Sequence, residues 1–202
     1  DVVLGFGSNG RVYTVPVSEL PGARGDGSPL TGFVNLAPGT QMVSYYAGHN
    51  DDLLLLSMRS GNGFLANVAD MSTRNKAGKS FISIDAKVAG DAPLGAAKVE
   101  VGMKQVACLS AASKLLVFPL DELKRLPTGG KGVILMGLDD KEFMSSAIAV
   151  GPNGATYSGA GRAGKPTELS LDAKTLKSFA GNRARKGHFV EPRLKDGKLK
   201  AS

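Results

Sequence analysis

Residues 1–17, DVVLGFGSNGRVYTVPV, consist of two apolar runs joined by Ser8-Asn9-Gly10. In the second run Tyr13, Val15 and Val17 alternate with Val12, Thr14 and Pro16, a period of two that favours a strand. An Asn-Gly pair between apolar runs indicates a type I′ turn. The sequence therefore predicts a β-hairpin at the start of the chain.

The same stretch contains the pattern Gly-x-Gly-x-x-Gly over 5–10, and Asp26 lies 21 residues beyond its first glycine. This spacing occurs in dinucleotide-binding sites, where the glycines must lead into a helix. Here they lead into a strand, and Pro16 inside a helix would cost about 3 kcal/mol. The second copy, over 159–164, is soon followed by Pro166. The AGKS run over 77–80 resembles the end of a P-loop, but the glycine that this motif needs five residues before Gly78 is replaced by Thr73. We exclude all three as nucleotide sites.

A short segment of the form apolar-x-acidic-Leu/Met recurs along the chain. It reads VSEL at 17–20, VADM at 68–71 and LDEL at 120–123, and a weaker copy, LDAKTL, occupies 171–176. The first residues of these segments lie 51, 52 and 51 positions apart. A period near 50 built from short strands is typical of one four-stranded blade of a propeller.

We therefore expect an all-β fold, a propeller-like disc of four-stranded blades. The expected repeats are 1–50, 51–103, 104–150 and 151–202, within one domain that covers 1–202. Each short segment is followed by a loop that mixes Arg or Lys with Gly. In a radial array, loops at one phase of the repeat share one ring of the surface. We predict that these loops form a basic belt: Arg24, Arg74, Lys76, Lys79, Lys124, Arg125, Lys131, Arg183, Arg185 and Lys186.

The charge distribution is consistent with a polyanionic partner. The net charge is +7; residues 1–101 carry 8 Lys/Arg against 9 Asp/Glu, and residues 102–202 carry 17 against 9. Arg, Lys and glycine amides together suit phosphate. The sequence contains no recognition helix, zinc-ligand cluster or aromatic ladder, so a belt of this kind favours contact with the backbone of bent duplex DNA over base reading. The alternative is that these loops are merely solvated turns.

Few residues suggest chemistry. Cys108 lies in the apolar run VACL, which predicts a buried thiol, and a single cysteine is consistent with a reducing cytoplasm. His49 and His188 are far apart, and neither has the partners of a metal site. We expect no catalytic residue and no metal or cofactor site. Asp139, Asp140 and Glu142 form an acidic group in the basic half, where it could mark the end of a DNA path. No apolar run is long enough to span a membrane.

Two stretches carry a family resemblance: GRVYTVPVSELPGARGDGSPLTGFVNL (10–36) and TRNKAGKSFISI (73–84). They resemble consecutive blades of the C-terminal domains found in the A subunits of bacterial type IIA topoisomerases, and topoisomerase IV is a closer match than gyrase. The resemblance covers essentially the whole chain. It implies a β-pinwheel, in which neighbouring blades exchange strands, and a basic outer rim that binds and bends duplex DNA. Such a domain presents DNA to a separate cleavage core and favours decatenation and relaxation.

The resemblance also implies that this chain is a non-catalytic fragment of a longer polypeptide. ATP and Mg²⁺ would then belong to the missing parts, and the partners would be duplex DNA, the N-terminal cleavage domain and the B subunit of topoisomerase IV. The isolated domain would be monomeric, and the protein would act at the nucleoid in the cytoplasm.

No loop reproduces the Gln-Arg-Arg-Gly-Gly-Lys-Gly box of gyrase; TGGKG at 128–132 is nearest. Four repeats are visible, where the family usually has five or six. A gyrase wrapping domain and a protein-interaction scaffold remain as alternatives.

Overall fold

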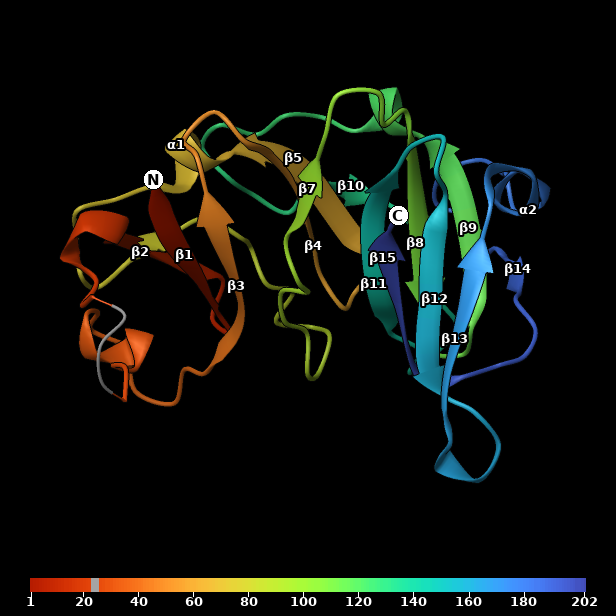
Figure 1. Ribbon diagram of the computed structural model, residues 1–202, viewed down its shortest axis with the longest axis horizontal. Coiled ribbons are helices and arrows are strands. Elements are labelled where there is room, and N and C mark those ends of the chain that lie inside the picture. The colour runs from red at the N-terminus through yellow and green to blue at the C-terminus, as the bar shows by residue number, and fades with distance from the viewer. Residues whose placement is uncertain (23–25) are drawn as a thin grey trace.

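The computed structural model describes residues 1–22 and 26–202, which form fifteen strands in four antiparallel sheets (Figure 1). In spatial order the first sheet is β3 (Met42–Gly48), β1 (Val2–Gly7), β2 (Arg11–Pro16) and β6 (Lys79–Ser80), and the second is β10 (Val133–Ile134), β5 (Asn62–Asn67), β4 (Leu53–Ser57) and β7 (Ala97–Val99). The third is β11 (Met144–Val150), β8 (Gln105–Ser110), β9 (Lys114–Pro119) and β14 (His188–Phe189), and the fourth is β13 (Pro166–Leu171), β12 (Ala155–Ala160) and β15 (Lys195–Ala201). The predicted all-β class is confirmed.

Helices are few and short. They are η1 (Val17–Glu19), η2 (Leu30–Gly32), α1 (Val68–Met71), η3 (Leu120–Glu122), η4 (Arg162–Gly164) and α2 (Ala173–Ser178). The repeated sequence segment corresponds to η1, α1, η3 and α2, each of which follows the second strand of a hairpin. The period in the sequence therefore marks a real structural repeat.

Neighbouring repeats exchange strands. The edge strands β6, β10 and β14 pair with β2, β5 and β9, so the last strand of each of the first three sheets comes from the following repeat. The fourth sheet has three strands, where the sequence predicted four. The difference follows from the exchange, because a fourth strand is supplied by the next repeat in the other three sheets.

The edge strands β3, β7, β11 and β15, one from each sheet, meet around one central cavity, which we call the hub. A cavity of about 500 Å³ is lined by Val43, Leu94, Phe143 and Lys195, at or just before the strands β3, β7, β11 and β15. All four repeats thus surround one axis, and the exchanged strands lie at the other edge of the sheets, away from it. Figure 1 shows the first sheet at the left, the second in the middle, and the third and fourth overlapping at the right.

The core lies between successive sheets. Strand β4 is almost entirely apolar because both of its faces are covered: Leu54 and Leu56 pack with Phe6 of the first sheet, whereas Leu55 packs with Val106 of the third. Successive side chains of a strand point to opposite faces, so a sheet that is buried on both sides has no polar stripe. The inner strands of the third sheet follow the same rule.

The segment between η1 and β3 has a different role from the later basic loops. Leu30, Phe33 and Val34 cover the outer face of the first sheet, against Tyr13 and Val15. This run therefore does not lead to an exchanged strand, although the sequence grouped it with the other three loops. Arg24, the residue predicted for the belt here, lies outside the described residues.

The first hairpin is confirmed, but its turn is not type I′. Only Gly10 has a positive φ, 79°, and its N–H donates to the Gly7 carbonyl. This geometry is typical of a type I turn followed by one left-handed residue. Gly164 has the same place in the fourth repeat, with a φ of 74° and a bond to Gly161. The two Gly-x-Gly-x-x-Gly patterns thus occupy the same place in their hairpins, although the second turn differs because Ala163 also has a positive φ, 56°.

Candidate nucleic-acid interface

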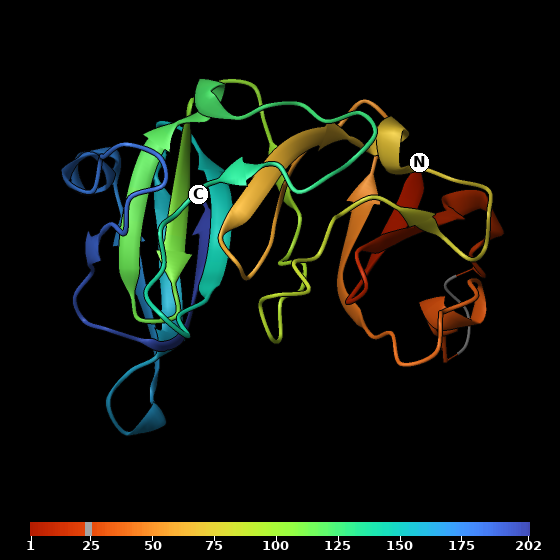
Figure 2. The same cartoon turned by 180° about the vertical axis from the view of Figure 1, so that it is seen from behind.

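Three equivalent loops carry most of the predicted belt. We call residues 72–78, 123–132 and 179–187 the first, second and third exchange loops, because each runs from a short helix of one repeat to the strand that joins the preceding sheet. Figure 2 shows the second of them, between β9 and β10, crossing from the third sheet to the second. Since β6, β10 and β14 form the outer edges of their sheets, the loops leading to them lie along that edge.

Each exchange loop ends in a glycine with positive φ: Gly78 at 73°, Gly132 at 73° and Gly187 at 71°. A Cβ on Gly132 would lie 2.0 Å from the Gly63 carbonyl oxygen, and one on Gly187 would lie 2.4 Å from that of Leu115. The sequence suggested that such glycines admit a phosphate. In the structure these glycines have a role within the fold, because the lack of a side chain lets the exchanged strand approach the preceding sheet.

The exchanged segments are also bonded to one another. Gly130 donates to the Phe81 carbonyl at 2.8 Å and accepts from Ser83 at 3.0 Å. One repeat later, Ala184 donates to Leu135 at 2.9 Å, and Gly137 donates to Arg185 at 3.0 Å. These backbone bonds connect the second loop to the segment after β6 and the third loop to the segment after β10. The predicted basic residues of these loops therefore share one continuous edge.

Five of the predicted cations extend from this edge with exposed side chains. Among the described residues, no hydrogen bond or ion pair engages the side chains of Arg74, Lys76, Lys124, Arg125 or Arg185. At least one of them lies in each exchange loop. They are the groups that can bind an external anion without first breaking an internal contact.

The other four predicted residues have contacts within the protein. Lys79 donates to the Asp70 carbonyl at 2.6 Å, and Arg183 donates to the Ile134 carbonyl at 2.6 Å beside Glu122. Lys131 pairs with Asp85 at 2.6 Å, and Lys186 pairs with Asp139. The predicted belt thus divides into residues that can bind outward and residues that also hold the loops in place.

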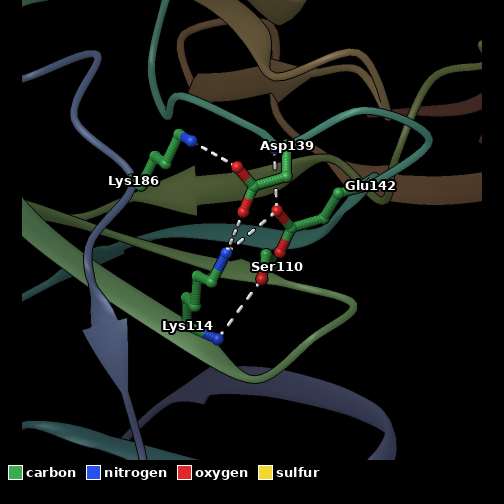
Figure 3. A network of polar contacts seen from close by, with 5 residues as sticks. All are labelled: Ser110, Lys114, Asp139, Glu142 and Lys186. Carbon is green, nitrogen blue, oxygen red and sulfur yellow. Dashed lines mark hydrogen bonds and ion pairs between the residues drawn. The ribbon is translucent and has the colours of Figure 1, made fainter.

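The pair at the third exchange loop is part of a larger network (Figure 3). Lys114 lies between Asp139, at 2.5 Å, and Glu142, at 3.3 Å, while Lys186 approaches Asp139 from the other side. Hydrogen bonds from Lys114 and then Lys186 lower the pKa of Asp139 to about 2. The acidic group that the sequence placed in the basic half is therefore an anchor for two lysines.

Sequence reasoning missed Arg11 as a residue that shapes this edge. Its guanidinium donates to the Ala77 carbonyl at 2.9 Å and to the Gly78 carbonyl at 2.8 Å, which holds the end of the first exchange loop. Arg11 is 67 residues from Gly78, and no local pattern connects them. Only the exchange of β6 into the first sheet brings the two together.

The cysteine and the two histidines, which the sequence analysis considered for a chemical role, occupy structural positions. Cys108 is fully buried, and burial raises the pKa of its thiol far above the usual range. His49 lies in the turn before β4 and pairs with Asp1 at 2.6 Å, and His188 is exposed in β14. Within 1–22 and 26–202, no group of three or more His, Cys, Asp or Glu is arranged to hold a metal ion, and no helix is long and apolar enough to cross a membrane.

Comparisons with known proteins identify the family. The profile of a family described as DNA gyrase C-terminal domain, beta-propeller, matches residues 1–39 and 104–150. The DNA topoisomerase 4 A subunit of Pseudomonas aeruginosa is 33% identical over 186 residues, which cover 90% of this chain. The chain belongs to the family of C-terminal domains of gyrase and topoisomerase IV A subunits. The corresponding protein of Neisseria gonorrhoeae is 30% identical over 87% of the chain.

The chain spans about a quarter of the length of these relatives, 24% and 23% respectively. Solved structures of family members share the fold. The C-terminal domain of Escherichia coli ParC superposes with a TM-score of 0.80 at 24% identity, covering 98% of this chain and 80% of that one. The C-terminal domain of DNA gyrase A superposes with a TM-score of 0.72 at 19% identity, covering 93% and 59%. The β-pinwheel predicted for this chain is thus confirmed.

Proposed function

We propose that the outer edge of this domain binds double-stranded DNA without sequence preference and bends it. The observation that carries the proposal is the continuous edge of exchange loops, from which five exposed cations project. Contacts of this kind reach phosphates rather than base edges, so they orient DNA without reading it. Because the loops follow a curved edge, a duplex that touches all three must bend with it.

We further propose that the domain is a non-catalytic part of a topoisomerase IV A subunit. In this role it presents a DNA segment to the N-terminal cleavage domain of the same polypeptide, which works with the B subunit of the enzyme at the nucleoid, and it favours decatenation and relaxation. ATP and Mg²⁺ act in those other parts. The 33% identity to a topoisomerase 4 A subunit supports this assignment over a gyrase wrapping domain.

A salt titration tests the DNA proposal. Each neutralised phosphate contributes about −0.9 to the slope of log affinity against log salt, so five cations predict a slope of about −4.5 for any duplex sequence. A duplex labelled at both ends should also show increased energy transfer on binding. A flat salt response, or no binding at about 50 mM salt, the low end of the usual range, would instead favour a protein-interaction scaffold.

Paired variants locate the surface. Arg74→Ala with Lys76→Ala, and separately Lys124→Ala with Arg125→Ala, should each reduce the slope by about 1.8 on every duplex. Exposed substitutions of this kind cost under about 0.5 kcal/mol each, so the melting temperature should hardly change. The matched control is Lys195→Ala with Lys200→Ala, which removes two exposed charges from β15 at the hub edge. An equal effect of the control would show that net charge, and not this edge, determines binding.

A further inference from the structure

A lysine near the end of an exchange loop meets an aspartate of the preceding repeat, and this happens twice. Lys131 lies two residues before β10 and pairs with Asp85, six residues after the first residue of β6. Lys186 lies two residues before β14 and pairs with Asp139, six residues after the first residue of β10. The identical register shows that the repeat geometry itself builds these pairs.

Both carboxylates are held in place by further bonds. Asp85 accepts the backbone N–H of Lys87 at 3.0 Å, and Asp139 also holds Lys114. The hydrogen bond from Lys131, followed by the one from Lys87, lowers the pKa of Asp85, so the carboxylate is ionised at neutral pH. The lysine side chains remain 48% and 60% exposed, so solvent and DNA can reach them.

We propose that Asp85 and Asp139 are built-in competitors of DNA phosphate, each occupying one lysine of the outer edge. This inference rests on the proposed function. A carboxylate and a phosphate are alternative anions for one ammonium group, and the carboxylate is always present at high effective concentration because it belongs to the same chain. DNA must therefore displace it before Lys131 or Lys186 contributes, and the two aspartates limit how tightly the domain holds a duplex.

The first exchange loop lacks this device. Ala77 occupies the position of Lys131 and Lys186, and the cations of the loop, Arg74 and Lys76, have no carboxylate partner among the described residues. Without the two aspartates, the second loop would offer DNA three unpaired cations and the third two, against two at the first. The competitors therefore keep the second and third loops from holding a duplex more tightly, and part of the contact stays easy to release.

Asp85→Asn is the principal test, because Asp85 holds a single lysine. Releasing Lys131 should tighten duplex binding about three-fold near 100 mM salt and steepen the salt slope by about 0.9. Asp140→Asn is the control: it removes the same charge from an exposed residue that holds no lysine within the described chain. The control should leave the slope unchanged. Equal behaviour of Asp85→Asn and Asp140→Asn would overturn the proposal.

Lys131→Ala completes a double-mutant cycle. It should hardly affect binding in the wild-type background, and it should return the Asp85→Asn variant to the wild-type slope. If Lys131→Ala weakens binding equally in both backgrounds, the lysine already contacts DNA and the proposal fails. Asp139→Asn with Lys186→Ala repeats the cycle at the third loop; if melting shows that Asp139→Asn unfolds, the Asp85 cycle decides alone.

The outcomes separate this inference from the function on which it rests. Wild-type protein that binds duplex with a steep salt slope, while the variants show no coupling, overturns only the competitor role. Wild-type protein that does not bind duplex at about 50 mM salt overturns the proposed function and this inference together.

Discussion

At the scale of single residues, Ser113 shows how one position of the repeat departs from glycine. It occupies the left-handed hairpin position that Gly10, Gly61 and Gly164 fill elsewhere, with a φ of 63°. Its buried hydroxyl accepts from Tyr157 at 3.0 Å and donates to the Leu194 carbonyl at 3.2 Å. Leu194 in turn donates its N–H to Tyr157 at 2.9 Å. Backbone strain is therefore offset by a closed set of hydrogen bonds between the third and fourth repeats.

Tyr157→Phe should destabilise the domain by about 1–3 kcal/mol, because it leaves the Leu194 N–H buried without its acceptor and removes the donor to Ser113. Urea unfolding followed by circular dichroism measures the change. Tyr45→Phe is the control, since Tyr45 is 55% exposed and should lose little. Equal unfolding midpoints for the two variants would mean that this network contributes nothing.

At the scale of elements, the exchanged strand depends on the glycine in front of it. Gly187 and Gly102 both have positive φ, 71° and 92°, but their surroundings differ. A Cβ on Gly187 would collide with the Leu115 backbone, whereas nothing lies within 4 Å of one on Gly102. Alanine substitutions at these two glycines therefore separate two contributions to the free energy of unfolding. One is the cost of a positive φ, and the other is the cost of a steric clash with the neighbouring backbone.

Gly187→Ala should therefore destabilise the protein more than Gly102→Ala, which bears only the conformational penalty of about 1 kcal/mol. We also expect faster amide exchange in β14 and in the part of β9 that pairs with it, because the clash detaches the exchanged strand. Hydrogen exchange with mass spectrometry measures this locally. Similar stability of both variants would show that the third sheet tolerates the strand at a larger separation.

At the scale of the whole molecule, one carboxylate joins the first and second repeats. Asp52 accepts the Tyr46 hydroxyl of β3 at 2.7 Å and the His49 N–H at 2.8 Å, and it pairs with Lys98 of β7 at 3.0 Å. These contacts, the Tyr46 bond first, lower the pKa of Asp52 from 3.8 to about 2. A lowered pKa in the folded state means that ionised Asp52 stabilises the fold.

This stabilisation should be complete above about pH 4 and should disappear as the pH falls through about 2, because the unfolded chain takes up the proton first. Asp52→Asn should flatten the pH dependence of the unfolding free energy in that window and lower stability at neutral pH. Asp51→Asn, at the exposed neighbour, is the control. Denaturant unfolding at a series of pH values measures both. An unchanged pH profile in Asp52→Asn would contradict the assigned linkage.

The sequence predicted the fold and the loops well because both depend on a period. Segments 51 or 52 residues apart mark the repeat, and left-handed glycines recur at its turns. It could not predict which cations are available. Lys131 and Asp85 are 46 residues apart, and nothing near either residue indicates the other. Such pairs arise only after strands have been exchanged, so the loop charges predicted from the sequence include lysines that have a partner within the protein.

The exchange of strands also sets an order in which the chain can assemble during synthesis. When Asn67 leaves the ribosome, the first sheet already has three strands, but β6 follows only after α1 and the first exchange loop have emerged. The second sheet waits in the same way for β10, and the third for β14. Each of the first three sheets can therefore be completed only after part of the following repeat has been synthesised, and until then one of its edges stays unpaired.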